Sequence, residues 1–170
     1  MSLRKLPLRI APSLVCLSAL ACGNVSELNV TLSFTSAEIE DTTTQVMLVV
    51  QLPPKDGDPC APLWADPPAA LGQPFVRLVD YPNATDLLAA GLADERYAIF
   101  AYAHATQFDL FCKNSGECAG SSVGRSCHAI GGGQQACVAS DRAVSPLAAG
   151  CAVGTVGLET APIRISLAPR

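Results

Sequence analysis

The sequence predicts an all-β protein, built as a single antiparallel β-sandwich of about seven strands with a long disulfide-stapled loop. Three observations indicate this fold class. Only 15% of the 170 residues are charged, and 13 glycines and 13 prolines are spread along the chain. The apolar residues fall in short runs that end at turn residues, and several runs alternate with polar residues. Such runs are typical of the strands of a sandwich.

Two segments predict the first strands. Residues 28–35 (LNVTLSFT) alternate apolar and polar side chains, which is the period-2 pattern of a half-buried strand. Residues 45–52 (QVMLVVQL) form a continuous apolar run before Pro53 and Pro54. The length of this run and its valines favour a buried central strand over a helix.

Five further segments are candidate strands because each is a short, largely apolar run bounded by turn residues. They are 74–81 (PFVRLVDY), 84–92 (ATDLLAAGL), 95–105 (ERYAIFAYAHA), 108–112 (FDLFC) and 163–167 (IRISL). In the last of them, Ile163, Ile165 and Leu167 are expected to face inward. The segment 84–92 fits a strand and a single helical turn equally well.

The stretch GLADERYAIFAYA, residues 91–103, is similar to a recurrent feature of prealbumin-like and fibronectin-like (immunoglobulin-like) sandwich domains. In those domains a leucine and a tight turn lead into a strand that carries an inward-facing tyrosine. Asp94, Glu95 and Arg96 stand here in place of the usual turn glycine. The resemblance implies a sandwich architecture and carries no activity with it.

The first 21 residues have the organisation of a signal peptide. Residues 4–9 carry three basic side chains, residues 10–21 form an apolar run, and Ala19 and Ala21 occupy the two positions that a signal peptidase reads. The run is too short to cross a bilayer as a helix, which takes about 20 residues. We therefore expect export, with cleavage before Cys22.

The segment SALAC, residues 18–22, resembles the lipobox of bacterial lipoproteins, in which a small residue precedes an invariant cysteine. The resemblance implies that the sulfur of Cys22 receives a diacylglyceryl group and that the new amino terminus is acylated, for example with palmitate. Two or more acyl chains hold a protein stably on a membrane. Gly23 follows the cysteine, where many Gram-negative lipoproteins retained in the inner membrane have an aspartate, so the resemblance favours the outer membrane.

The cysteine count agrees with lipidation. Of eight cysteines, Cys16 leaves with the leader, and modification of Cys22 leaves an even set of six, compatible with three disulfides in an oxidising compartment. The six are Cys60, Cys112, Cys118, Cys127, Cys137 and Cys151. Five of them lie within 112–151, so one of these must pair with Cys60 if all three bridges form. The pairing itself is open among fifteen possibilities.

Catalytic and metal sites are not expected. GSSVG matches the G-x-S-x-G motif of hydrolases around Ser122, with His104 and His128 as candidate bases, but no apolar strand precedes it and no periodic helix follows. The cysteines lack the C-x-x-C pairs of structural zinc sites. The DGD at 56–58 lacks the ordered ligand series of a calcium loop. We therefore expect no enzyme activity, no metal and no cofactor.

These observations predict a signal peptide at 1–21, a lipidated tether at 22–27 and a sandwich domain at 28–170 with a cysteine-rich insertion at 112–151. The mature chain would carry eight basic and fifteen acidic side chains, which argues against a nucleic-acid partner. The expected function is a non-catalytic envelope lipoprotein with a structural or protein-interaction role at the outer membrane. The alternative is a secreted carbohydrate- or ligand-binding module that uses Trp64, in the proline-rich segment 53–74.

Overall fold

The structure, a computed structural model, describes residues 26–64, 75–82, 86–108, 111–118, 125–139, 144–157 and 161–169. The predicted leader with Cys22, and Ser122, lie outside the described residues. The elements are β1 (Ser26–Phe34), α1 (Ala37–Thr42), β2 (Gln45–Gln51), the 3₁₀ helix η1 (Ala61–Trp64), β3 (Phe75–Asp80), β4 (Asp86–Leu92), β5 (Arg96–His104), the 3₁₀ helix η2 (Ser115–Cys118), β6 (Arg125–Gly131), β7 (Gln134–Ala139), β8 (Ala148–Thr155) and β9 (Ile163–Pro169). None of the described helices has the length and apolar character needed to cross a membrane.

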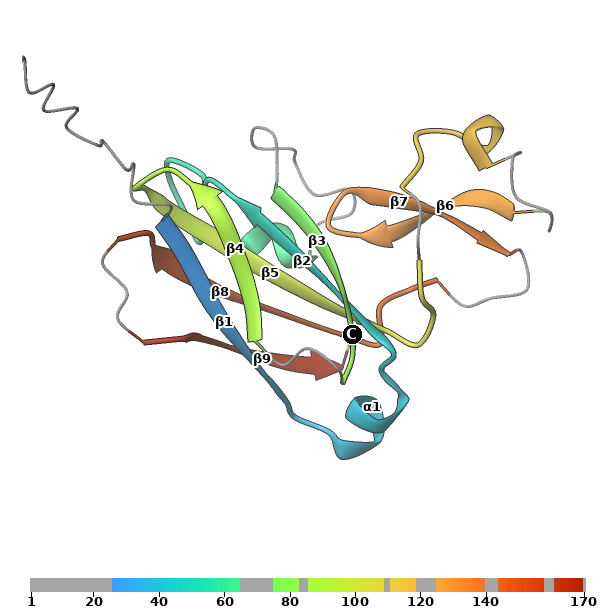
Figure 1. The fold of residues 1–170 in the computed structure, drawn as a ribbon, viewed down its shortest axis with the longest axis horizontal. Coiled ribbons are helices and arrows are strands. Elements are labelled where there is room, and N and C mark those ends of the chain that lie inside the picture. Colours follow the sequence, from blue (N-terminus) through green and yellow to red (C-terminus); the bar gives the residue numbers. More distant parts are fainter. Residues whose placement is uncertain are drawn as a thin grey trace, which may run out of the picture.

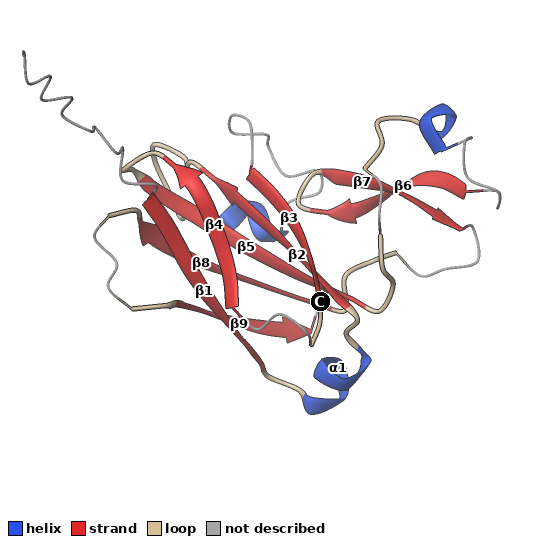
Figure 2. Cartoon of the chain, in the orientation of Figure 1, coloured by secondary structure: helices blue, strands red, loops and turns tan. Residues whose placement is uncertain are grey.

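Seven strands form one curled sheet in the order β3-β2-β5-β8-β9-β1-β4, and β6 and β7 form a separate two-stranded sheet (Figure 1). All neighbours pair antiparallel except β1 and β9, which run parallel. Strand β9 pairs with β8 at only two residues and with β1 at five, so within the seven-stranded sheet the ladder of paired residues is shortest between β8 and β9. The two halves of the sheet enclose a core, as in a sandwich, and strands dominate the molecule (Figure 2). The predicted all-β class is therefore confirmed.

Most predicted strands are present. Strands β1, β2, β3, β5 and β9 begin and end within two residues of the predicted segments, and the ambiguous segment 84–92 forms β4. Every residue of β2 is buried, which confirms its interpretation as a central strand. Segment 108–112 was predicted as a strand, but in its described part only Phe111 pairs, in an isolated bridge with Ala136.

The curl of the sheet encloses the first core. Its residues come from alternate positions of β1, β2, β5 and β9, as period-2 alternation requires. Among its fully buried members are Leu28, Val30, Val46, Leu48, Ile99, Ile165 and Leu167. Burial of each such aliphatic side chain stabilises the fold by about 1.5–3 kcal/mol.

Strand β8 was not predicted, although it lies at the centre of the sheet. Its sequence, AAGCAVGT, offers little apolar pattern. A Cβ at Gly150 would overlap the backbone oxygen of Ser166, and one at Gly154 would overlap the side chain of Ile163. The glycines therefore allow β9 to approach β8 closely. Because this packing requires small residues, the sequence of β8 lacks the apolar pattern by which a strand is predicted.

A second core lies on the opposite face of β2 and β5. Alternate residues of these strands, including Met47, Phe100 and Tyr102, pack against Ile130 and Val138 of the β6–β7 hairpin. The predicted cysteine-rich loop thus contains a hairpin that covers the sheet, rather than only irregular structure. Burial on both faces explains why β2 and β5 are almost continuously apolar.

The hairpin turn is built from glycine. Gly132 and Gly133 form a two-residue loop with φ angles of +55° and +70°, a conformation that glycine adopts readily. A Cβ on Gly132 would lie 3.0 Å from both Tyr102 Cε2 and Val49 Cγ2. The turn therefore rests directly on the sheet and fixes the hairpin against it.

Candidate functional site

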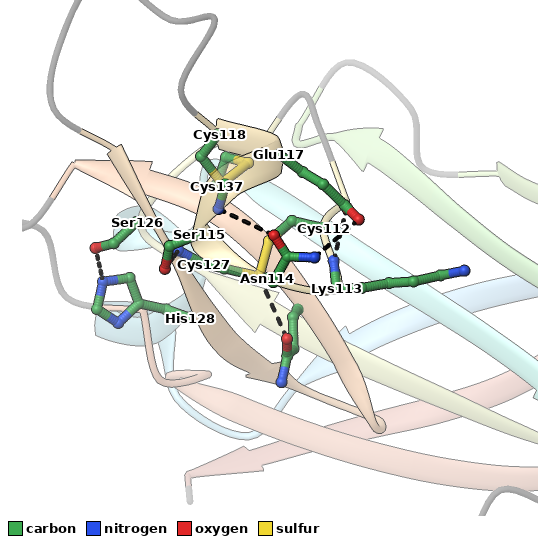
Figure 3. The surroundings of a disulfide bond; sticks show 12 residues. Cys112, Lys113, Asn114, Ser115, Glu117, Cys118, Ser126, Cys127, His128 and Cys137 are labelled. Atoms are coloured by element: carbon green, nitrogen blue, oxygen red, sulfur yellow. Dashed lines mark hydrogen bonds between the residues drawn. A yellow bond between two sulfur atoms is a disulfide. The ribbon is translucent and has the colours of Figure 1, made fainter.

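The six cysteines form three disulfides, Cys60–Cys151, Cys112–Cys127 and Cys118–Cys137. As the cysteine count required, Cys60 pairs with a cysteine of the insertion. This bridge ties the loop before η1 to the central strand β8. The other two bridges lie together in what we call the stapled unit, residues 111–118 and 125–139 (Figure 3).

Within the stapled unit, the two bridges hold the segment with η2 against the hairpin. Cys127 and Cys137 are directly opposite one another on β6 and β7, and each bonds to a cysteine of the preceding segment. The N–H of Cys112 also donates to the backbone oxygen of Gln135, at 3.1 Å. Each unstrained bridge contributes about 2–4 kcal/mol, so the unit is fixed covalently where its apolar contacts are few.

Side chains complete the turn around η2. The carboxylate of Glu117 accepts hydrogen bonds from the N–H of Lys113 (2.9 Å) and from the side-chain amide of Asn114 (3.2 Å). The side-chain oxygen of Asn114 accepts from the N–H of Gly116, at 3.0 Å. These local bonds satisfy backbone donors that the short turn leaves without helical partners.

The sulfur atoms of the stapled unit lie close together but do not form a thiolate set. The Sγ atoms of Cys112, Cys118 and Cys137 are within 4.8 Å of one another. All three are bonded in disulfides, and zinc is bound by thiolates rather than by disulfide sulfur. Their proximity follows from the two adjacent bridges.

A cleft, which we call the junction cleft, lies where the stapled unit meets the end of the curled sheet. It has two adjoining parts, of about 510 Å³ and 460 Å³, and Gln107 and Arg125 line both. The remaining lining residues are Thr44, Gln45, Asp80, Ala105, Thr106, Phe108, Cys137, Val138 and Ala139. The cleft is therefore built by strand ends of the sheet on one side and by the hairpin on the other.

The floor of the junction cleft is held by a buried glutamine. Gln45 is only 4% exposed, and its side-chain oxygen accepts from the N–H of Phe108 at 2.9 Å. Its amide nitrogen donates to the Phe108 backbone oxygen at 3.2 Å and to Asp80 Oδ1 at 3.4 Å. One side chain thus fixes the loop after β5 to the ends of β2 and β3.

His104, one of the candidate bases, is a core residue beside this floor. It is 1% exposed, packs edge-on against Phe108 with ring centroids 4.8 Å apart, and neither ring nitrogen has a hydrogen-bond partner among the described residues. Burial lowers the pKa of His104 from 6.5 to about 4, and the nearby backbone of Val144 opposes this shift only in part. His104 is therefore neutral at pH 7 and inaccessible to a substrate.

His128, the other candidate base, lies on β6 next to Ser126. The Ser126 Oγ and the His128 Nε2 are 2.6 Å apart (Figure 3). A serine–histidine pair acts as a nucleophile only with a group that orients the histidine and donors that bind an oxyanion. In the described part of the chain, no carboxylate hydrogen-bonds to His128, so the pair lacks the orienting group.

Trp64, the candidate carbohydrate contact, ends η1. The neighbouring Leu63 packs into the second core, and Cys60 fixes the start of this segment to β8. The side chain of Trp64 and residues 65–74 lie outside the described part of the structure. The carbohydrate site at Trp64 therefore stays a prediction.

The polar residues of the junction cleft were not predicted from the sequence. Thr44, Gln45 and Asp80 lie at the ends of β2 and β3, and Thr106 and Gln107 follow β5. Only the strand order brings these ends together. The one available signal was that polar residues flank the apolar strands β2, β3 and β5. This signal predicts a site only when it is known that these strands are neighbours in the sheet.

In the comparisons with known proteins, no family model matches the chain, and neither a curated protein nor a solved structure matches it.

Proposed function

We propose that this protein is an exported, non-catalytic envelope lipoprotein, held at the outer membrane through Cys22, with a structural or protein-interaction role. The observation that carries the proposal is the complete pairing of the other mature cysteines. All six are bonded in disulfides, which are typical of oxidising compartments outside the cytosol. Cys22 would then be the single unpaired thiol of the mature chain, and lipidation consumes it.

The distance between anchor and domain supports attachment close to the membrane. Strand β1 begins at Ser26, four residues after Cys22. A fully extended chain of this length spans at most about 14 Å. The sandwich would therefore lie next to the bilayer, with the end that carries Ser26 and its pairing partner Leu92 facing the lipid.

A secreted ligand-binding module is the second candidate, and the junction cleft favours it. Each of its two parts, of about 510 Å³ and 460 Å³, has a volume within the range of about 300–1,000 Å³ that is usual for small-ligand sites. The absence of an anchor, rather than the presence of the cleft, would distinguish this candidate from the first.

The intact mass of protein recovered from the membrane fraction of a Gram-negative host tests the proposal. We expect a chain that begins at Cys22 and carries the added mass of diacylglyceryl and acyl groups. A Cys22→Ala variant should lose the lipid and move to the soluble fraction. A Cys16→Ala variant is the matched control, because Cys16 leaves with the leader and the mature mass should not change. An unmodified, soluble wild-type chain beginning at Cys22 would contradict the anchor and favour the secreted module.

A further inference from the structure

We propose that the stapled unit is a thiol–disulfide exchange site, at which an external thiol converts the two bridges of the unit into a second pairing. In the structure the bridges are Cys112–Cys127 and Cys118–Cys137. In the second pairing Cys112 is joined to Cys118, and Cys127 is joined to Cys137. All four cysteines are bonded in either pairing, so the exchange does not depend on the proposed anchor.

Three sulfur atoms of the stapled unit lie beside one another. The Sγ atoms of Cys112, Cys118 and Cys137 are all within 4.8 Å, although Cys112 belongs to one bridge and the other two to the second (Figure 3). Disulfide exchange requires a thiolate to reach the sulfur of another bridge. A thiolate released at Cys112 would therefore already lie beside the Cys118–Cys137 bridge.

The register of the hairpin allows the second pairing. Cys127 and Cys137 are directly opposite one another on β6 and β7. Opposite residues of an antiparallel pair share a face of the sheet and have Cα atoms about 4.5–5.5 Å apart. A disulfide takes a Cα separation of about 4.4–6.8 Å. Rotation of the two side chains can therefore form this bridge without a change in the strand register.

Solvent exposure determines where an external thiol reacts. Cys127 is partly exposed, whereas the other three cysteines of the unit are buried. Exposed fractions are 7% for Cys112, 1% for Cys118 and 3% for Cys137. Access is one of the factors that decide which sulfur of a disulfide is attacked. Of these four cysteines, Cys127 is therefore the one that a thiol reaches first.

The exchange takes three steps, and each step forms one S–S bond and breaks one. An external thiolate, such as that of reduced glutathione, bonds to the Cys127 sulfur, and Cys112 leaves as a thiolate. Cys112 then bonds to the Cys118 sulfur, and Cys137 leaves as a thiolate. Finally, Cys137 bonds to the Cys127 sulfur and expels the external thiolate. The thiol is regenerated, so no oxidant or reductant is consumed.

The two pairings differ in the parts of the unit that they join. In the structure, both bridges attach the segment that contains η2 to the β6–β7 hairpin. In the second pairing, one bridge closes a loop within residues 112–118 and the other lies within the hairpin. The segment would then keep contacts such as the hydrogen bond from the Cys112 N–H to the Gln135 oxygen, but no covalent cross-link. The exchange therefore releases the η2 segment from the hairpin.

Disulfide mapping after mild thiol treatment tests the proposal. The chain carries Cys16→Ala and Cys22→Ala, which leaves six of its eight cysteines whether or not a leader is removed. It is incubated with a catalytic amount of reduced glutathione, quenched with acid and cleaved with trypsin, which cuts after Lys113 and Arg125. In the observed pairing, tryptic peptide 126–142 is bonded to both preceding peptides. In the second pairing it is released with an internal bridge.

We expect glutathione to release peptide 126–142 with its internal bridge, while Cys60–Cys151 keeps its pairing. The same treatment in urea is the positive control, because it scrambles all three bridges and shows that the thiol is active. Failure to release the peptide under native conditions, with scrambling in urea, would overturn the proposal.

Two single-thiol variants in the same background separate the sulfur grouping from ordinary thiol reactivity. Cys127→Ala frees Cys112, and the matched control Cys60→Ala frees Cys151, which is partly exposed. Among the described residues, Cys151 does not belong to the sulfur group. Free thiols are alkylated after an acid quench and located by mass spectrometry.

In the Cys127→Ala variant, we expect alkylation to be shared between Cys112 and the two cysteines of the neighbouring bridge without any added thiol. In the Cys60→Ala variant, we expect alkylation of Cys151 alone. Alkylation confined to Cys112 in the first variant, or equal spreading in both, would overturn the proposal. Near-UV circular dichroism establishes folding, and if Cys127→Ala is not folded, the glutathione experiment decides.

Discussion

In the curled sheet, β2 is buried at all seven of its positions, whereas in the stapled unit β6 buries only Ile130. The sheet is held by apolar side chains that alternate between two cores. The cluster of buried residues inside the stapled unit consists of cysteines alone. The stapled unit buries Ile130, Ala136 and Val138 against the sheet, and away from the sheet it is stabilised by covalent bonds.

The bridges of the two regions also act over different lengths of chain. Cys60–Cys151 spans 91 residues and fixes to β8 the loop before η1, whose Leu63 packs into the second core. Cys118–Cys137 spans 19 residues within the stapled unit. The first restrains a loop of 91 residues in the unfolded chain and the second a loop of only 19. We therefore expect removal of the long bridge to lower the stability of the whole domain, and removal of the short bridge to affect mainly the local order of the stapled unit.

The largest effect is expected from the long bridge. In the chain-entropy description, a Cys60→Ala/Cys151→Ala variant loses about 4–5 kcal/mol of unfolding free energy, and a Cys118→Ala/Cys137→Ala variant about 3 kcal/mol. Urea unfolding measures the totals. Hydrogen exchange should show faster exchange of β6 and β7 in the second variant, while β2 and β5 keep their protection. Equal loss of protection in both regions would show that the stapled unit and the sheet unfold together.

The next effect is a loss of stability at low pH, caused by His104 beside the floor of the junction cleft. Because the pKa of His104 is lowered to about 4, the folded protein keeps this ring neutral while the unfolded chain binds a proton below about 6.5. The unfolded state therefore binds more protons between these values, and stability falls as pH decreases through them, by about 3 kcal/mol in total.

Unfolding in urea at pH 7 and pH 4.5 measures this loss. A His104→Phe variant should lose less stability between the two pH values than the wild type does. His128→Gln, which changes the partly exposed histidine of the stapled unit, is the matched control and should keep the wild-type dependence. An unchanged pH dependence in His104→Phe would contradict the role assigned to burial of His104.

The smallest effect is expected where the two regions touch. Gly132→Ala places a Cβ against Tyr102 and Val49 at a positive φ, and should cost about 2–3 kcal/mol. Gly57→Ala is the control, because its φ is +96° but no atom lies within 4 Å of the added Cβ, so only the backbone cost of about 1 kcal/mol remains. Equal losses of unfolding free energy would mean that the turn does not press on the sheet.

The strands that alternate or run continuously apolar could be predicted from the sequence, because their pattern follows from the face they bury. This holds for β1, β2, β5 and β9. It fails for β8, where close approach of the neighbouring strand selects small residues and removes the pattern.

The hairpin carried a signal that the sequence interpretation did not use. Two glycines between short segments are a known mark of a two-residue hairpin turn, and Gly132 and Gly133 form one. The cysteine count predicted the number of bridges but not their pairing, since spacing does not define distance in space. The junction cleft could not be predicted at all, because residues as far apart as Thr44 and Arg125 meet only through strand order.

The parallel pairing of β1 and β9 has a mechanical consequence. The two strands lie side by side over five residue pairs, from Val30 with Ile163 to Phe34 with Leu167. Because they run in the same direction, the start of β1 and the end of β9 lie at opposite ends of the pair. A pulling force applied between Ser26 and Pro169 would therefore load all five pairs in shear at once, instead of peeling them apart one by one. A domain tethered at its N-terminal end and pulled at its C-terminal end would resist extension in its strongest direction.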